Sequence, residues 1–584
     1  MTPVLLARGF YEEQNDAHGR WATRESVLEF EPADHPRFLS FWVLSEFRDL
    51  TQELSVTIAN QSTRLVLPSG WSPVSIDVPP GARHAALSVN KLLPPTYHPS
   101  DPRSLGVRLR AVGLHRDRER HRHVVERHDN VVANVREMLS GRALLKSTPP
   151  SLGIDLYGAC NIKPPCVYCG WDTSKAMEGD LVDTPFTIET LREWGPFFDH
   201  STDLVNCSIG EPFMMKNIDE LLDAFAAGGK SLNLTTNGQI LTDTNIQKVI
   251  GRPIDLNISF DAATPATYAT LRNERFELLL NNVRRLITAK GGPGRLPTVN
   301  VVFMPMKANI TELDAFVRIC ADLRVDHLVL RPLNYADKVE LNWERAGYRF
   351  EYEKELLPFE DLVKASGRAF ELCRQFGVPL SDQMDFGGAV GRQFTEWYEQ
   401  GRQSAIVVPR AGHAASPVDA AGERAAIADG PVVPVGIEAP AEATPAPGSD
   451  RLPACTEPWK SLYILRRGVL PCCHGGRPLA PMDQYRDVWN SPMLQAIRTD
   501  LSRGRFHQYC LESPSCPIVR KAQQAGEPSG GLRVRVRRAG VVLDDYRHRA
   551  VWARQWAGIR LRRAFTEPDY LPRQVKRVLG RLIR

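Results

Sequence analysis

The feature of this sequence with the clearest chemistry is a group of three closely spaced cysteines. The segment GACNIKPPCVYCGW, residues 158–171, has the pattern C-x5-C-x2-C and contains Cys160, Cys166 and Cys169. A closed structural zinc site uses four protein ligands, and no further Cys or His lies close to this segment in the sequence. Three thiolates from one loop instead suit an iron–sulfur cubane whose fourth iron stays open to a substrate or a cofactor. Zinc binding and simple buried thiols are the alternatives.

The residues that follow these cysteines alternate between short apolar runs and helical stretches. Between residues 151 and 334 six runs stand out: SLGIDLYG, LVNCSIG, SLNLTTNG, PIDLNISFD, TVNVVFMP and HLVLRPLN. Strands that alternate with helices indicate βαβ units and a parallel sheet. Six repeats predict an α/β fold with a partial (β/α)6 TIM-like barrel, in which ligands bind at the carboxyl ends of the strands.

Polar groups gather at the predicted strand ends. The second, third and fourth runs end in SIGEP, TTNG and NISFDAAT, and Cys160 follows the first run. These ends offer backbone N–H groups, an amide and carboxylates, a set that could hold a zwitterionic nucleoside by its ammonium, carboxylate and ribose. The residues concerned are Gly210, Glu211, Pro212, Asn237, Ser259 and Asp261.

Residues 151–334 resemble the radical S-adenosylmethionine (radical SAM) enzymes. The resemblance rests on the cysteine loop with Tyr168 before its last cysteine, on the GEP step, and on SFDAATPATYATLRN, which is similar to the peptide-maturase-like branch. The family's usual loop is C-x3-C-x2-C, so this loop is two residues longer. Pro164 and Pro165 can stiffen the longer loop because proline fixes φ.

The resemblance implies a cofactor site at the strand ends. A [4Fe–4S] cluster would be bound by the three loop cysteines, with S-adenosylmethionine chelating its open iron. Gly210 and Glu211 would contact the amino group of S-adenosylmethionine, and Ser259 and Asp261 the region of its carboxylate and ribose. The complete set of implied cofactor-binding residues is Tyr168, Gly210, Glu211, Pro212, Asn237, Ser259 and Asp261.

The C-terminal cysteines resemble the auxiliary-cluster domains, SPASM and its shorter twitch variant, that often follow a radical SAM barrel. The segments CTEPWKSLYILRRGVLPCC and CLESPSC supply enough thiols for one further [4Fe–4S] cluster. Cys473 could replace Cys472, and zinc on the same thiolates is the alternative. The ligands that we assign to this auxiliary cluster are Cys455, Cys472, Cys510 and Cys516.

The other three cysteines are expected to pack in the core, since free Cys is among the most buried residue types. They are Cys207, Cys320 and Cys373. Cys207 has the best prospect of a redox role, because its strand borders the interior of the predicted barrel.

Two classes of function follow from these motifs. An enzyme would cleave S-adenosylmethionine reductively, abstract hydrogen from a substrate, and use the auxiliary cluster to accept an electron or to bind the substrate. It would require an external electron donor of the flavodoxin or ferredoxin type. A sugar or glycan-type intermediate is favoured as the substrate and a peptide is next, on the weak analogy of the N-terminal sandwich to domains of polysaccharide enzymes. The alternative is a metal-stabilised binding or scaffold protein with structural cysteines.

The remaining chain is expected to contain flanking domains. Seven short apolar or alternating runs in residues 1–112 predict a β-sandwich, and the Arg/His-rich residues 113–150 a solvated helical connector. Mixed structure at 335–403 would extend the barrel. An Ala/Pro-rich disordered linker at 404–452 would lead to the cysteine-rich domain at 453–522.

Charge is concentrated in the tail at 523–584. The chain has a net charge of +5, yet residues 533–584 alone hold 15 Lys/Arg against 4 Asp/Glu. Basic helices with an apolar face suit an anionic membrane surface, while nucleic acid is a weaker candidate. Packing of that apolar face on the protein itself is the alternative. No signal peptide or spanning segment is recognisable, so we expect a cytoplasmic protein with a peripheral membrane contact through the tail.

Overall fold

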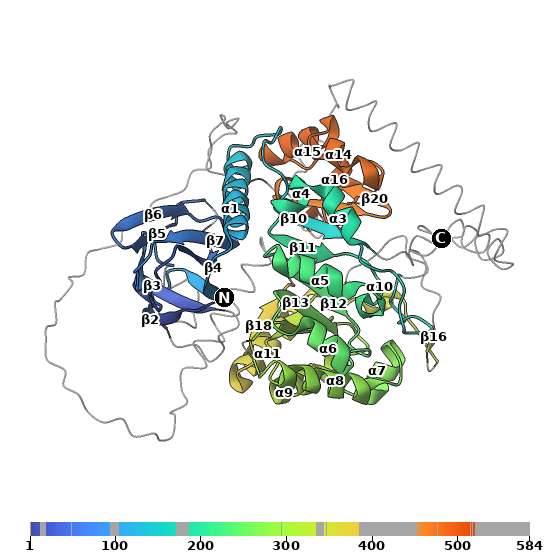
Figure 1. Cartoon of the computed structure of the whole chain (residues 1–584). Helices are drawn as coiled ribbons and strands as arrows, with labels where there is room; N and C mark the ends of the chain where they lie inside the picture. The colour runs from blue at the N-terminus through green and yellow to red at the C-terminus, as the bar shows by residue number, and fades with distance from the viewer. Residues whose placement is uncertain are drawn as a thin grey trace, which may run out of the picture. The chain divides into compact units, whose positions relative to one another are not determined.

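A computed structural model gives the structure of the chain (Figure 1). It describes residues 2–11, 19–47, 49–93, 104–170, 186–293, 295–333, 344–345, 347–384, 453, 455–475, 477–513, 516 and 518–519. The predicted linker at 404–452 and the predicted basic tail at 523–584 lie outside these residues. Among the helices of the described part, none has the length and apolar character needed to cross a membrane.

The N-terminal part is all-β. Each of the seven apolar runs coincides with a strand, and two more strands, β1 and β2, precede them. The strands are β1 (Thr2–Pro3), β2 (Leu5–Phe10), β3 (Arg20–Glu29), β4 (Arg37–Ser45), β5 (Glu53–Ile58), β6 (Gln61–Val66), β7 (Gly70–Val78), β8 (His84–Val89) and β9 (Arg108–His115).

Strand β3 joins two antiparallel sheets in this part. The strand order is β6-β5-β8-β3-β9-β4-β7. Residues 25–29 of β3 pair with β8, whereas Arg20 and Trp21 pair with β9. Apolar side chains of both sheets, such as Leu54 and Phe41, belong to one buried core. This packing is what the alternating pattern of the strands predicts.

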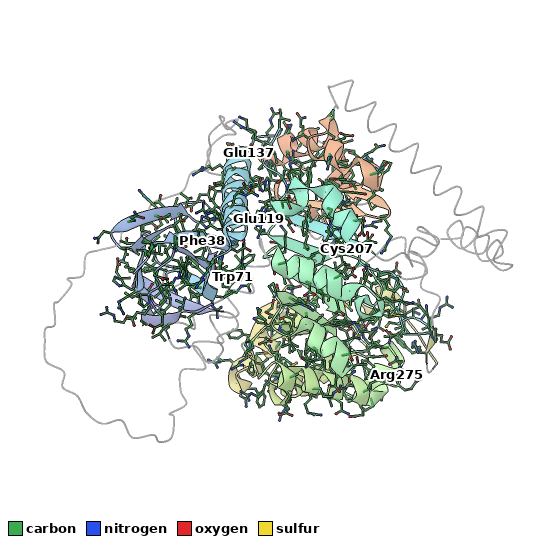
Figure 2. All side chains as sticks on the ribbon, viewed as in Figure 1. Phe38, Trp71, Glu119, Glu137, Cys207 and Arg275 are labelled. Atoms are coloured by element: carbon green, nitrogen blue, oxygen red, sulfur yellow. The ribbon has the colours of Figure 1, made fainter. Side chains whose placement is uncertain are left out.

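Helix α1 (Arg118–Leu139) follows β9 and packs against β7. Glu119 and Glu137 lie near its two ends (Figure 2). The helix is predicted from the sequence as solvated, and it is solvated on one side only, since Val124, Arg127 and Val132 are buried. One side of the helix is buried against the sheet, where His128 Nδ1 lies 3.0 Å from Ser72 Oγ in β7.

A buried arginine attaches α1 to the rest of the fold. Arg127 Nε and Nη1 donate to the carbonyl oxygens of Asp199 and Gly229 over 3.2 and 3.1 Å. Burial lowers the pKa of Arg127 to about 10, and the nearby Asp199 opposes this effect. These carbonyls lie close to the ends of two helices, where backbone acceptors lack intrahelical partners. An Arg/His-rich helix can therefore be buried when its cations meet such acceptors.

The second sheet contains all six strands predicted between residues 151 and 334. Its order is β18-β15-β14-β13-β12-β11-β10-β19-β20, and the strands from β10 to β15 are parallel neighbours in sequence order. The strands are β10 (Ser151–Ile154), β11 (Asp203–Asn206), β12 (Ser231–Thr236), β13 (Ile254–Ser259), β14 (Thr298–Phe303), β15 (His327–Leu330), β18 (Leu380–Asp382), β19 (Ser461–Leu465) and β20 (Gly468–Leu470). The α/β class is thereby confirmed.

Helices cover one face of this sheet (Figure 1). The helices between β10 and β18 are α3 (Ile188–Trp194), α4 (Pro196–Asp199), η3 (Pro212–Met214), α5 (Ile218–Ala227), α6 (Asp243–Val249), α7 (Pro265–Leu271), α8 (Phe276–Ala289), η4 (Ile310–Glu312), α9 (Leu313–Leu323), α10 (Tyr352–Glu355) and α11 (Phe359–Phe376). A short hairpin, β16 (Glu344–Arg345) with β17 (Tyr348–Arg349), lies between β15 and α10.

The two faces of the sheet differ in character. Leu256 and Ile258 in β13 are fully buried, and the rings of Phe303 in β14 and Phe316 in α9 lie 4.7 Å apart. The side chains between them in sequence, such as Asn257, point to the opposite face, because successive strand residues alternate. Apolar packing under the helices therefore leaves polar groups on the inner face.

The C-terminal cysteine segment continues the same sheet. Residues 461–464 of β19 pair in parallel with residues 151–154 of β10, and β20 pairs with β19. This segment, predicted as a domain of its own, thus begins beside the strand that carries the first cysteine loop. Its helices are α13 (Glu457–Lys460), η5 (Met482–Gln484), α14 (Tyr485–Trp489), α15 (Pro492–Ser502) and α16 (Gln508–Leu511).

Candidate active site

The first cysteine loop follows β10 at its carboxyl end. Cys166 is buried, while Cys160 and Cys169 are half-buried. The Cys169 N–H donates to the Cys166 carbonyl over 2.9 Å, which makes a tight turn. Burial raises the pKa of the Cys160 and Cys166 thiols. Without a positive partner such thiols stay protonated, so their use as ligands depends on the charges around them.

The GEP motif after β11, residues 210–212, contacts the start of the cysteine loop. The Glu211 N–H donates to the Ala159 carbonyl over 2.7 Å. A Cβ atom on Gly210 would lie 2.4 Å from the carbonyl carbon of Gly158 and 2.5 Å from the Ala159 oxygen. Only glycine allows two backbone segments to approach this closely. Pro212 is buried and begins η3.

The carboxyl group of Glu211 is directed into the protein. Its Oε1 accepts from the Thr236 hydroxyl and its Oε2 from the Asn237 N–H, each over 2.8 Å. Burial raises the pKa of Glu211 to about 7, while its hydrogen bonds to Asn237, Thr236 and Phe213 oppose the rise. In this arrangement Glu211 ties the end of β11 to the end of β12. The predicted contact with the amino group of S-adenosylmethionine remains a prediction.

Asn237, at the end of β12, contacts the cysteine loop. Its Nδ2 lies 2.7 Å from Asn161 Oδ1 and 3.6 Å from Cys160 Sγ. Its Oδ1 accepts from the Gln239 N–H over 2.9 Å. The sequence predicts Asn237 as a residue of the cofactor site, and the structure places it against one of the three thiols.

Asp261, after β13, is a buried hub for three other segments. Its Oδ1 accepts from the Met304 N–H over 2.9 Å, and its Oδ2 accepts from the Tyr168 hydroxyl over 2.7 Å and from Arg272 Nη2 over 2.5 Å. Asp261 has a φ of 62°, in the left-handed region that Asp tolerates better than most residues. Ser259, two residues earlier, is half-buried at the end of β13. Direct contact of either residue with the cofactor remains a prediction.

Arg272, which the sequence reasoning missed, completes this group. It follows α7, is 5% exposed, and its Nη1 lies 3.7 Å from Cys166 Sγ. The Arg272 guanidinium also lies over the ring of Tyr168, 5.4 Å from its centroid. The segment SFDAATPATYATLRN contains Arg272, but a single arginine at a helix end gives no pattern that marks it.

The C-terminal cysteines occupy one neighbourhood of the fold. Cys455, Cys472, Cys510 and Cys516 are half-buried, and Cys473 is exposed. Burial raises the pKa of Cys472 well above its usual value, and the nearby thiols of Cys473, Cys510 and Cys455 raise it further. Burial likewise raises the pKa of Cys510 to about 12, with Cys455 and Cys516 contributing. Cys473 is more exposed than Cys472, and both lie close to the other thiols, so the choice of Cys472 as the ligand remains a prediction.

In the described part of the chain, potential ligand side chains are not arranged around a single metal ion. No group of three or more His, Cys, Asp or Glu side chains there is arranged to hold one metal ion. In a four-iron cluster each thiolate binds its own iron, so the thiols do not converge on one point. The choice between a cluster and zinc at either site therefore depends on the metal content of the protein.

The other cysteines differ in burial. Cys320 and Cys373 are 0% and 2% exposed, as expected for core residues. Cys207, labelled in Figure 2, is half-buried and packs beside Tyr463, Leu465 and Leu470 of the C-terminal strands. Burial raises its pKa to about 12, and Asp155 adds to the rise. A redox role for Cys207 remains a prediction.

Comparison with known proteins gives partial sequence matches. No protein-family model matches the chain. The probable GTP 3',8-cyclase of Methanothermobacter marburgensis is 29% identical over 119 residues, which cover 20% of this chain and 37% of that protein. The probable GTP 3',8-cyclase of Methanothermobacter thermautotrophicus is 27% identical over 164 residues, which cover 28% and 48%. The chain thus matches less than half the length of either relative.

Solved structures show a distant likeness. SuiB of Streptococcus suis bound to S-adenosylmethionine is 14% identical with a TM-score of 0.41, and the alignment covers 70% of this chain and 78% of that chain. Native anSMEcpe with bound AdoMet and Cp18Cys peptide is 14% identical with a TM-score of 0.30, over 40% and 63%. TM-scores this low do not establish a shared fold, so the family assignment rests on the sequence. The partial sequence matches to the two cyclases support the resemblance of the chain to the radical S-adenosylmethionine enzymes.

Proposed function

We propose that the chain is a radical SAM enzyme in which Cys160, Cys166 and Cys169 hold a [4Fe–4S] cluster. Such a cluster would supply the electron for reductive cleavage of S-adenosylmethionine to methionine and a 5′-deoxyadenosyl radical, the species that would take hydrogen from the substrate. The observation that most supports this is the attachment of the loop to three different strand ends. Each of three residues that follow a strand contacts the loop. Gly210 and Asn237 lie against its first residues, and Asp261 accepts from the hydroxyl of Tyr168 near its end.

The residues around the loop fit an anionic cluster. Arg272 is buried next to Cys166, and its Nε has no hydrogen-bond partner among the described residues. A buried N–H that stays unpaired costs about 1–3 kcal/mol, more for a charged group. Inorganic sulfides and thiolates beside Arg272 would supply acceptors that the protein alone does not.

The chain's own residues then have defined tasks in the proposed site. The Glu211 carboxyl and the Asn237 amide keep the ends of β11 and β12 in register with the loop. Ser259 is half-buried, so its hydroxyl can reach a ligand at the end of β13. S-adenosylmethionine would lie against these strand ends, with the partial barrel below it as the substrate chamber.

The inner face of the sheet supports a polar substrate. His327 Nδ1 lies 2.9 Å from Asn300 Oδ1, Asn300 Nδ2 lies 3.3 Å from Asn257 Oδ1, and Asn257 Nδ2 lies 3.0 Å from Asn233 Oδ1. This chain of side-chain hydrogen bonds crosses four strands. Amides and imidazoles both donate and accept, as hydroxyl-rich ligands require. We therefore favour a sugar or glycan-type intermediate, with a peptide as the second candidate.

The C-terminal cysteines are proposed to hold an auxiliary [4Fe–4S] cluster of the SPASM or twitch kind. Their shared neighbourhood and the parallel pairing of β19 with β10 support this, because they bring the second set of thiols to the sheet that carries the first loop. The ligands in this proposal are Cys455, Cys472, Cys510 and Cys516. An electron donor of the flavodoxin or ferredoxin type and a cytoplasmic location belong to the same proposal.

Anaerobic reconstitution of the full chain with iron and sulfide tests the proposal. The expected result is the visible absorbance of iron–sulfur clusters and about eight iron atoms per chain, two four-iron clusters. Cys166→Ala should lose about half of the iron, whereas Cys373→Ala, a buried cysteine outside both sites, should lose none. Stoichiometric zinc and no iron would instead support the scaffold alternative, with structural cysteines.

A further inference from the structure

The buried Arg272 lies where it can act on the proposed cluster through a ligand thiol. Two contacts fix its position independently of any cofactor. Its backbone N–H donates to the Tyr268 carbonyl over 2.7 Å, and the preceding carbonyl, of Leu271, accepts from the Val167 N–H of the cysteine loop over 3.1 Å. A backbone hydrogen bond therefore joins the end of α7 to the cysteine loop.

The N–H donors of Arg272 are only partly used by the carboxylate with which it is ion-paired. The guanidinium remains protonated at any physiological pH. Its Nη2 pairs with Asp261 Oδ2, which also accepts from the Tyr168 hydroxyl. Its Nη1 is directed to Cys166 Sγ at 3.7 Å, and its Nε is without a partner among the described residues. One of the two terminal nitrogens of the Arg272 guanidinium, Nη1, is thus directed to the ligand sulfur, and the other to the carboxylate.

A second N–H group points to another ligand sulfur. Asn237 Nδ2 lies 3.6 Å from Cys160 Sγ. This amide is neutral, and it shares its N–H groups with Asn161 Oδ1. Cys160 is thus contacted by a neutral amide N–H and Cys166 by an N–H of a charged guanidinium.

Hydrogen bonds to the sulfurs and nearby charge set the reduction potential of iron–sulfur clusters. A reduced cluster carries one more negative charge than the oxidised one, so a buried cation stabilises the reduced form more. In the low dielectric of the interior this difference is larger than it is at a surface.

We propose that Arg272 is a positioning residue that raises the reduction potential of the cluster on Cys160, Cys166 and Cys169, through its N–H contact with Cys166 and its buried charge. This inference rests on the proposed function, since it requires a cluster on that loop. Asp261 limits the effect by neutralising part of the charge. The two residues thereby act on the potential in opposite directions.

The test is an EPR-monitored redox titration of the full-length reconstituted protein without S-adenosylmethionine. The signal of the first cluster is identified as the one that is lost in Cys166→Ala. Arg272→Gln should shift the reduction equilibrium at least tenfold toward the oxidised form, about 59 mV for a one-electron couple. Arg272→Lys should recover most of the shift because it keeps the charge. Asp261→Asn should move the potential the opposite way.

Arg285→Gln is the matched control, since Arg285 on the neighbouring α8 is also ion-paired, with Asp243, but is partly exposed. It should leave the potential unchanged. Equal potentials in all variants would overturn the inference, as would equal loss of iron from Arg272→Gln and Arg272→Lys, which would limit Arg272 to holding the loop. If Arg272→Gln fails to fold, a downward or zero shift in Asp261→Asn overturns the inference by itself. Absence of a cluster from the wild-type loop would overturn the proposed function as well.

Discussion

Substituting Gly210 with alanine should displace the cysteine loop. The added Cβ would lie 2.4 Å from the Gly158 carbonyl carbon and 2.5 Å from the Ala159 and Tyr157 oxygens. Ordinary carbon contacts begin near ~3.5 Å, so the loop must move by about 1 Å. That movement stretches the bond from the Glu211 N–H to the Ala159 oxygen, now 2.7 Å long, beyond the ~3.2 Å limit of a good hydrogen bond.

The energetic cost follows from these two effects. Overpacking against rigid neighbours costs about 1–3 kcal/mol, and loss of the hydrogen bond costs about 1 kcal/mol more. The obstructing atoms are backbone, which cannot rotate away as a flexible side chain would. A local destabilisation of about 2–4 kcal/mol is therefore expected for the loop and the strand end that holds it.

Hydrogen–deuterium exchange of the peptide covering residues 157–170 measures this directly. Amide exchange reports the free energy of local opening, and each 1.4 kcal/mol is a factor of about ten. The Val167 N–H, bonded to the Leu271 carbonyl over 3.1 Å, should exchange about 30-fold faster or more. Gly228→Ala is the control, because its nearest contact would be 3.2 Å and its φ is ordinary. Unchanged exchange in Gly210→Ala would refute the close-contact reasoning.

Three further predictions concern other parts of the chain. Because burial raises the pKa of Glu211 from 4.5 to about 7, the native state holds this proton more tightly than the unfolded state. The free energy of unfolding of the metal-free protein, measured with urea, should then fall as pH rises through that interval, and Glu211→Gln should flatten this dependence. The same pH dependence in Glu211→Gln as in the wild type would contradict the burial of the Glu211 carboxyl as the cause. Cys455→Ala should remove only the second cluster and leave S-adenosylmethionine cleavage intact; stoichiometric zinc at that site would show it to be structural. A chain ending at Gly530 should lose sedimentation with anionic liposomes, since Lys/Arg near such a surface contributes about 1 kcal/mol each; equal pelleting of both chains would exclude the membrane contact.

The sequence predicts the elements of the site well, because they depend on local patterns. Apolar runs between amphipathic helices locate all six strands from β10 to β15, and the parallel topology then brings their ends together. Gly210, Asn237 and Asp261 consequently lie against the cysteine loop. Their individual contacts are less predictable, as Asn237 illustrates: it is expected at the cofactor, yet it lies 2.7 Å from Asn161 in the loop.

Long-range contacts explain what the sequence does not show. Arg272 is 106 residues from Cys166 in the chain, and no periodicity links the two. The pairing of β19 with β10 joins segments more than 300 residues apart. Arg127 is buried because carbonyl groups from two other segments surround it, whereas its Arg/His-rich surroundings in the sequence indicate a solvated helix. Each of these features depends on partners that only the folded chain brings together.

Formation of 5′-deoxyadenosine from S-adenosylmethionine tests the central claim most directly. The reconstituted full-length protein is incubated anaerobically with dithionite and S-adenosylmethionine, and the products are separated by liquid chromatography with mass detection. We predict 5′-deoxyadenosine and methionine in equal amounts from the wild-type protein, and neither from Cys160→Ala, Cys166→Ala or Cys169→Ala. Cys373→Ala should behave as the wild type does. A protein that carries a reducible cluster on this loop and yields no 5′-deoxyadenosine would contradict the account, and so would a Cys166→Ala variant that still yields it.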